Sequence, residues 1–145
     1  MRRAVSLLDV NVLIALFEPN HIHHSLAHNW FADARSDGWA TCPLTQNGFI
    51  RITSQRSYAY PTTPHLAIKS LRQLTTHSDH HFWPDAVSLL DSAVCDATKL
   101  LSSAQITDSY LLVLAKQNGG KLVTFDTRLV ANAVPGGEDH LQLIA

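Results

Sequence analysis

The amino-acid sequence predicts an α/β domain of three layers, with helices on both faces of a mostly parallel sheet. Short apolar runs, each long enough for one buried strand, alternate with segments whose apolar residues recur at helical spacing. Asp9, Asp108 and Asp126 lie where such segments end or begin. The 145 residues fit one domain, which we place at 1–145.

The composition limits the class of protein. Hydrophobic residues make up 46% of the chain and charged residues 16%, which is typical of a globular protein and too apolar for disorder. The net charge of −1 argues against a partner that is held through bulk positive charge alone. The nine histidines would raise the net charge below pH ~6.5, near the reference pKa of histidine.

The cysteines and the N-terminus indicate a cellular compartment. Cys42 and Cys95 form no CxxC pair, which argues against a thiolate zinc site and fits a reducing environment. The apolar run after Met1 is short and already contains Asp9, so it resembles neither a signal peptide nor a membrane span. We therefore expect a cytoplasmic protein.

The elements follow from local patterns. Residues 4–8 are apolar and end at Asp9, which predicts a buried strand, and the apolar stripe over 10–17 predicts a helix that ends before Pro19. The same reasoning predicts further strands at 39–42, 80–83, 121–125 and 141–144, further helices at 23–34, from 43 onward, at 65–75, 84–90 and 106–117, and a polar loop at 53–64. Asn118-Gly119-Gly120 ends the clearest of these helices.

The three aspartates predict a metal site. Asp9 and Asp126 end buried strands, and Asp108 lies in the first turn of the helix expected at 106–117. Parallel strands place sites at their carboxyl ends, where three carboxylates would repel one another unless a cation lay between them. Oxygen ligands favour Mg²⁺ or Mn²⁺, and through them phosphodiester chemistry. Alternatively each aspartate only caps a helix or a turn; Thr107 competes with Asp108 for that role, and Asn11 is either a polar neighbour of the site or a turn residue.

Several motifs together resemble PIN-domain proteins. The run Leu7-Leu8-Asp9-Val10-Asn11 resembles their opening, and Ile106-Thr107-Asp108 and Thr124-Phe125-Asp126 resemble their later acidic motifs. Residues 39–45 and 135–141 resemble the VapC toxin branch. The resemblance implies a PIN-like α/β/α fold and a Mg²⁺-dependent endoribonuclease toxin that cuts RNA to leave a 5′-phosphate and a 3′-hydroxyl. It also implies inhibition by a VapB-type antitoxin.

One position departs from the family pattern. Many PIN domains carry a glutamate on the helix after the second strand, close to a threonine, but Thr45 is followed here by Gln46. An amide can ligate or position water without supplying charge, and the replacement is compatible with natural variation or with engineering. The metal would then rest on Asp9 and Asp108, with Asp126 completing or supporting the site. In a competing register the missing acid aligns with Gly48.

A second function class remains open. A PIN-like domain that lost catalysis with its acidic residue would serve only to bind RNA or an antitoxin. A phosphohydrolase with Asp9 as the nucleophile ranks third, because Asp9-Val10-Asn11 lacks the second aspartate typical of that chemistry.

Basic and aromatic side chains give weaker signals. Arg51 and Arg56 are candidates for holding RNA phosphates, or are solvated surface charges. Trp30, Phe31 and Trp39 belong to the core or to an interface. Together with the family resemblance, the interface reading predicts a homodimer.

The histidines of residues 21–28 have a plainer explanation. His24 and His28 have the spacing of two zinc ligands on a helix, but no glutamate follows His24 as a metalloprotease motif requires. Because His21 and His23 lie beside them, the pattern favours a solvated helix face over a zinc site.

Overall fold

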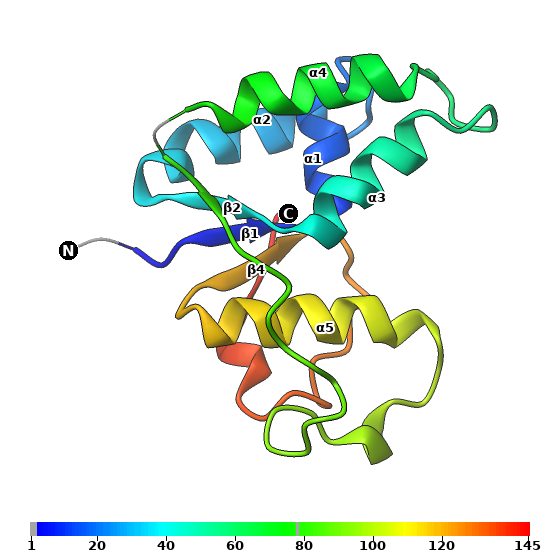
Figure 1. The fold of residues 1–145 in the computed structure, drawn as a ribbon. Coiled ribbons are helices and arrows are strands. Elements are labelled where there is room, and N and C mark those ends of the chain that lie inside the picture. The colour runs from blue at the N-terminus through cyan, green and yellow to red at the C-terminus, as the bar shows by residue number, and fades with distance from the viewer. Residues whose placement is uncertain (1–2, 78) are drawn as a thin grey trace.

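A five-stranded parallel sheet lies between two helical layers in the computed structural model, which describes residues 3–77 and 79–145 (Figure 1). The strands are β1 (Ser6–Leu8), β2 (Trp39–Thr41), β3 (His80–Phe82), β4 (Lys121–Thr124) and β5 (Leu141–Leu143). Their order is β3-β2-β1-β4-β5, and every neighbouring pair is parallel. The expected α/β/α architecture is confirmed.

The helices divide unequally between the two faces. They are α1 (Val10–Phe17), α2 (His24–Ala34), α3 (Pro43–Thr53), α4 (Pro64–Thr75) and α5 (Ala104–Gln117). The first four cover one face of the sheet, and α5 covers the other (Figure 1). None of the helices in the described part of the chain is long and apolar enough to cross a membrane.

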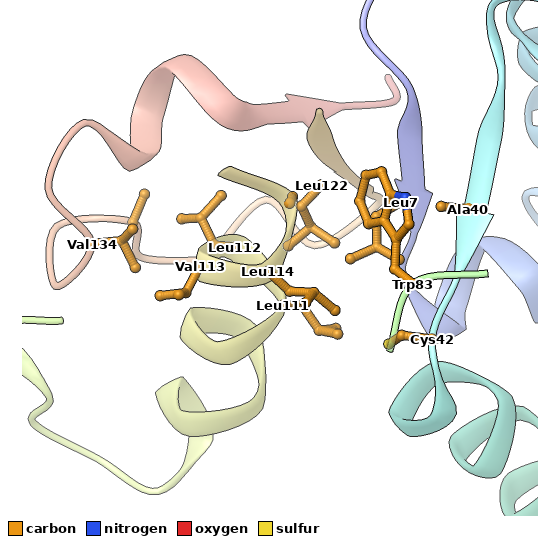
Figure 2. Close-up of a cluster of buried hydrophobic side chains, with 12 residues drawn as sticks. Leu7, Ala40, Cys42, Trp83, Leu111, Leu112, Val113, Leu114, Leu122 and Val134 are labelled. Carbon is orange, nitrogen blue, oxygen red and sulfur yellow. The ribbon is translucent and has the colours of Figure 1, made fainter. Parts of the chain in front are cut away.

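The core has one cluster on each side of the sheet. Alternate residues of a strand face opposite sides, so Leu7 and Leu122 pack against α5 while Leu8 and Val123 pack against the four-helix layer. Figure 2 shows the α5 side, where Leu111, Leu112 and Leu114 meet the strand side chains and Trp83 closes the cluster.

The aromatic residues expected in the core or at an interface are mostly in the core. Trp39 is fully buried and Phe31 is nearly so, and their rings meet edge to face with centroids 5.3 Å apart. Trp30 is half-buried beside them. The apolar surface on which the sequence-based dimer prediction rested is therefore largely internal.

The helix expected at 84–90 is wrong. The chain there is irregular, because short polar side chains compete for the backbone: Ser88 Oγ accepts from the Leu90 amide and Asp91 Oδ1 accepts from the Ala93 amide. The segment also has to cross from the end of β3 to the far face of the sheet, where α5 begins (Figure 1). An extended path spans that distance with fewer residues than a helix.

The end of α5 depends on two glycines. Gly119 has φ +68°, the left-handed conformation that ends a helix at low cost for glycine. Gly120 follows and lies so close to β1 that an added Cβ would come within 2.5 Å of the Val5 carbonyl oxygen. This close approach turns the chain directly into β4.

Candidate active site

The register of β1 and β4 brings two polar residues together. Leu8 pairs with Val123, and the Asp9 amide donates to the Val123 carbonyl at 2.9 Å. The next residues along each strand, Asp9 and Thr124, are therefore neighbours at the carboxyl edge of the sheet. The Thr124 hydroxyl donates to Asp9 Oδ2 at 2.8 Å.

Asp9 caps α1 and also faces the site. Its Oδ1 accepts from the Val10 amide at 2.8 Å, so the capping interpretation is confirmed. Its Oδ2 is held by Thr124. Asp9 can fill both roles because its carboxylate has two oxygens. The bond from Val10 to Oδ1 fixes the orientation of Oδ2, which accepts from Thr124.

Asn11 and Asp126 converge on the same hydroxyl. Asn11 Nδ2 donates to Thr124 Oγ1 at 3.1 Å, and the Asp126 amide donates to it at 3.1 Å. Asn11 Oδ1 accepts from the Phe125 amide at 3.3 Å. Asn11 thus ties the start of α1 to the end of β4.

Asp108 approaches from the other face of the sheet. The structure corrects its expected place: α5 begins at Ala104, two residues earlier than predicted, so Asp108 lies in the second helical turn. Ser103 occupies the cap position, and Thr107 is an exposed residue inside the helix, so Thr107 does not compete as a cap. The helix dipole therefore acts less strongly on Asp108 than the sequence suggested.

Asp108 lies within reach of the charges of Asp9 and Asp126. Burial, followed by the charges of Asp9 and Asp126, raises the pKa of Asp108 to about 6. Burial also raises the pKa of Asp9, against the hydrogen bonds from Thr124 and Val10, and Asp126 adds to the rise. Uncompensated carboxylates repel one another, which a bound cation would relieve.

These carboxylates suit a hydrated hard cation. Within residues 3–77 and 79–145, no three histidine, cysteine or acidic side chains converge into a complete metal cluster. Mg²⁺ does not require one, because it keeps several waters and is typically held by one or two carboxylates together with substrate phosphate. The charge coupling and the all-oxygen donor set fit such an ion.

Gln46 lies near the start of α3, directly after β2. Its Nε2 donates to Thr41 Oγ1 at 3.0 Å, and the side chain lines a hollow between α3 and α4 with Ile50 and Leu71. Among the described hydrogen bonds, none joins Gln46 to a carboxylate of the site. Gly48 faces α1 instead, where an added Cβ would come within 2.8 Å of Val10 Cγ2.

Two further predicted residues stay on the surface. Arg51 lies in the last turn of α3 and Arg56 in the loop that follows, and both are exposed. The structure does not bring them into the hydrogen-bonded network around Thr124.

Sequence reasoning missed the role of Thr124. The residue is fully buried and polar, and its hydroxyl joins Asp9, Asn11 and the Asp126 backbone. A threonine two residues before a strand-ending aspartate was the available signal. Its partners depend on pairing between segments far apart in sequence, which no local pattern reveals.

The similarities of the chain agree with this architecture. The PIN domain family matches residues 6–135. Ribonuclease VapC39 of Mycobacterium tuberculosis is 46% identical over 132 residues, covering 90% of this chain and 95% of the relative. Ribonuclease VapC44 of the same species is 45% identical over 137 residues, covering 94% and 96%.

A solved structure shares the fold. The crystal structure of Mycobacterium tuberculosis VapC20, described as a Sarcin-Ricin loop cleaving toxin, superposes with a TM-score of 0.65. It is 12% identical and covers 89% of this chain and 95% of that one. At that identity the likeness bears on the fold alone, whereas the family match and the two relatives identify the chain as a PIN-domain protein of the VapC ribonuclease family.

Proposed function

We propose that this chain is a divalent-metal-dependent endoribonuclease that acts as the toxin of a type II toxin–antitoxin pair. The observation that carries the proposal is the group of carboxylates at the carboxyl edge of the sheet, where Thr124 holds Asp9 and the charges of Asp9 and Asp126 raise the pKa of Asp108. The named ribonuclease relatives support the same reaction class.

Asp9 and Asp108 are the proposed metal ligands, directly or through water, and Mg²⁺ or Mn²⁺ is the proposed ion. When bound, such an ion supplies a water of lowered pKa and stabilises charge on the scissile phosphate. Thr124 holds Asp9 in orientation, and Asn11 holds the backbone after β4. Asp126 completes or supports the site. Water oxygen attacks phosphorus and the bond to the 3′ oxygen breaks, which leaves a 5′-phosphate and a 3′-hydroxyl.

The proposed partners are RNA, a VapB-type antitoxin and a second copy of the chain. Ile68 of α4 is an exposed apolar residue that lines the hollow with Gln46 and Leu71, a surface suited to an apolar peptide segment. The homodimer rests on the family resemblance, because Phe31 and Trp39 are core residues. Light scattering at micromolar concentration tests it, and a strict monomer would remove the claim.

The competing function is binding without catalysis, which the presence of Gln46 in place of an acidic residue favours. Cleavage of labelled single-stranded RNA by the purified protein, in Mg²⁺ and in EDTA, separates the two. We expect cleavage only with metal, and its loss in Asp108→Asn. Asp139→Asn, at an exposed acid in the Gly137–His140 turn, is the matched control and should cut normally. Equal cleavage in EDTA, or full activity of Asp108→Asn, would refute the proposed chemistry.

A further inference from the structure

An open hollow of about 490 Å³ adjoins the carboxylates. It lies between the turn that joins α1 to α2 and the segment that follows β4. Two of its lining residues, Asn11 and Asp126, belong to the site described above. The hollow is also lined by His21, His23, Phe125 and Arg128. Its volume lies in the ~300–1,000 Å³ range of small-molecule sites.

A stacked pair of rings forms one wall of this hollow. The rings of His23 and Phe125 lie 4.7 Å apart between centroids and are inclined by 16°. Every other ring pair recorded in the described part of the chain is inclined by at least 41°. Both side chains are partly exposed and line the hollow, and Phe125 also packs against the core, so His23 is the outer ring of the pair.

The pair is fixed to the carboxylate site. Phe125 lies between Thr124 and Asp126, and its amide donates to Asn11 Oδ1. The His23 amide donates to His21 Nδ1 at 3.0 Å, so the neutral ring of His21 carries its proton on Nε2 and offers a donor there. Burial, followed by the charge of His23, lowers the pKa of His21, which favours this neutral form.

Charge around the hollow suits a nucleic acid backbone. The side chain of Arg128 is 94% exposed and its Nε lies 3.9 Å from Asp126 Oδ1, a distance that water and salt screen. A guanidinium so exposed is free to bind phosphate. Ile22, whose side chain is 89% exposed, adds apolar surface at the rim.

We infer that this hollow is a nucleobase subsite, in which an unpaired base of single-stranded RNA stacks against the His23–Phe125 pair while Arg128 binds a neighbouring phosphate. The inference rests on the proposed ribonuclease function and specifies its substrate class. A base inside a duplex is already stacked and cannot use this wall, whereas a base in a loop or a single strand can. The subsite therefore selects single-stranded RNA and places one base beside the carboxylates.

Binding in EDTA tests the subsite without turnover. A fluorescently labelled short single-stranded RNA is titrated with the parent protein and each variant. We expect His23→Ala to weaken binding about 5- to 100-fold, from the ~1–3 kcal/mol that one base–aromatic stack contributes. His23→Tyr keeps a stacking ring and should bind nearly as the parent does. His65→Ala, at an exposed histidine of α4 that does not line the hollow, is the matched control.

A second arm distinguishes stacking from structural damage. RNAs that each lack the base at one position are also titrated. For the parent protein, removal of the stacked base should weaken binding. For His23→Ala, removal of the same base should leave the affinity unchanged, because that variant has already lost the stack. Circular dichroism checks that each variant is folded. Arg128→Gln should reduce the salt dependence of binding by about one phosphate contact.

The two proposals fail separately. If His23→Ala binds RNA as His65→Ala does, and the abasic scan is the same for both, the subsite is wrong whether or not the enzyme cuts RNA. If the predicted stacking losses appear but metal-dependent cleavage does not, the subsite is upheld and the ribonuclease proposal fails.

Discussion

The Thr124 hydroxyl donates a 2.8 Å hydrogen bond to Asp9 Oδ2 across 115 positions of sequence. The bond lowers the pKa of Asp9 against the burial that raises it. It therefore favours the ionised form of a nearly buried carboxylate and fixes its orientation. Thr124 acts as a positioning residue, since it works through Asp9.

Thr124→Val removes this donor without changing the shape of the side chain. Hydrogen bonds to charged groups contribute ~1.5–3 kcal/mol, so we expect a fall in kcat of roughly 10- to 100-fold. The pKa of Asp9 should rise further, which moves the acid limb of the pH–rate profile to higher pH. Thr124→Ser keeps the hydroxyl and should recover most of the activity. A valine variant with an unshifted profile would contradict this role.

Asp108→Asn should remove metal binding and cleavage while leaving the fold intact. The change removes one charge and almost no volume, and an amide is a poorer ligand for a hard cation. Calorimetric titration with Mn²⁺ measures the affinity, and Asp139→Asn provides the control. Normal Mn²⁺ affinity in the Asp108 variant would exclude Asp108 from the metal site.

In the absence of metal, the free energy of unfolding should fall as the pH rises from the ordinary pKa of an aspartate to the raised pKa of Asp108. Its folded-state pKa of about 6 exceeds the ordinary 3.8, so the folded protein binds more protons than the unfolded chain between these values. Stability is then lost as pH rises from about 4 to about 6, and the loss is complete above that. Because Asp108 is half-exposed, the effect is discounted to ~1 kcal/mol.

The comparison of parent and Asp108→Asn isolates this contribution. In EDTA at pH 7 the variant should melt about 3 °C higher than the parent, and the difference should vanish near pH 4. Histidine protonation affects both proteins and cancels in the difference. Saturating Mg²⁺ should stabilise only the parent, by mass action. If the two melting temperatures differed by the same amount at every pH, the raised pKa of Asp108 would be contradicted.

Gln46→Glu tests whether the missing acid belongs at this position. The sequence alone predicts stronger metal binding, but the Gln46 amide donates to Thr41 and the side chain lines the hollow against α4. We now expect Mn²⁺ affinity and cleavage rate to stay within about twofold, because the bond to Thr41 and the packing in that hollow direct the side chain toward α4. A clear rise in both quantities would restore Gln46 to the metal site.

Local patterns predicted most of the fold and part of the site. Strands and helices with strong apolar periodicity were found nearly to the residue, as at Val10–Phe17, because local sequence and tertiary packing agree there. Asp9 and Asp126 could be proposed for the site from the sequence because each lies just after a buried strand. The partners of Thr124 and the direction of the Gln46 side chain depend on strand register and helix phase in the assembled fold, which short-range patterns do not determine.

Gly120→Ala should destabilise the protein more than Gly119→Asn does at the neighbouring position. An added Cβ at position 120 would lie 2.5 Å from the Val5 carbonyl oxygen and 2.7 Å from the Trp83 ring. The backbone at Val5 cannot shift without disturbing β1, so overpacking should lower the free energy of unfolding by ~1–3 kcal/mol or more. At Gly119 an added Cβ meets nothing within 4 Å, and only its positive φ of 68° opposes substitution.

The matched control is Gly119→Asn, because asparagine tolerates a positive φ. This variant should lose ~1 kcal/mol or less of its free energy of unfolding. Urea unfolding of the three proteins measures the difference, and an equal midpoint for Gly120→Ala and the parent would mean that α5 and β1 are not packed as closely as described.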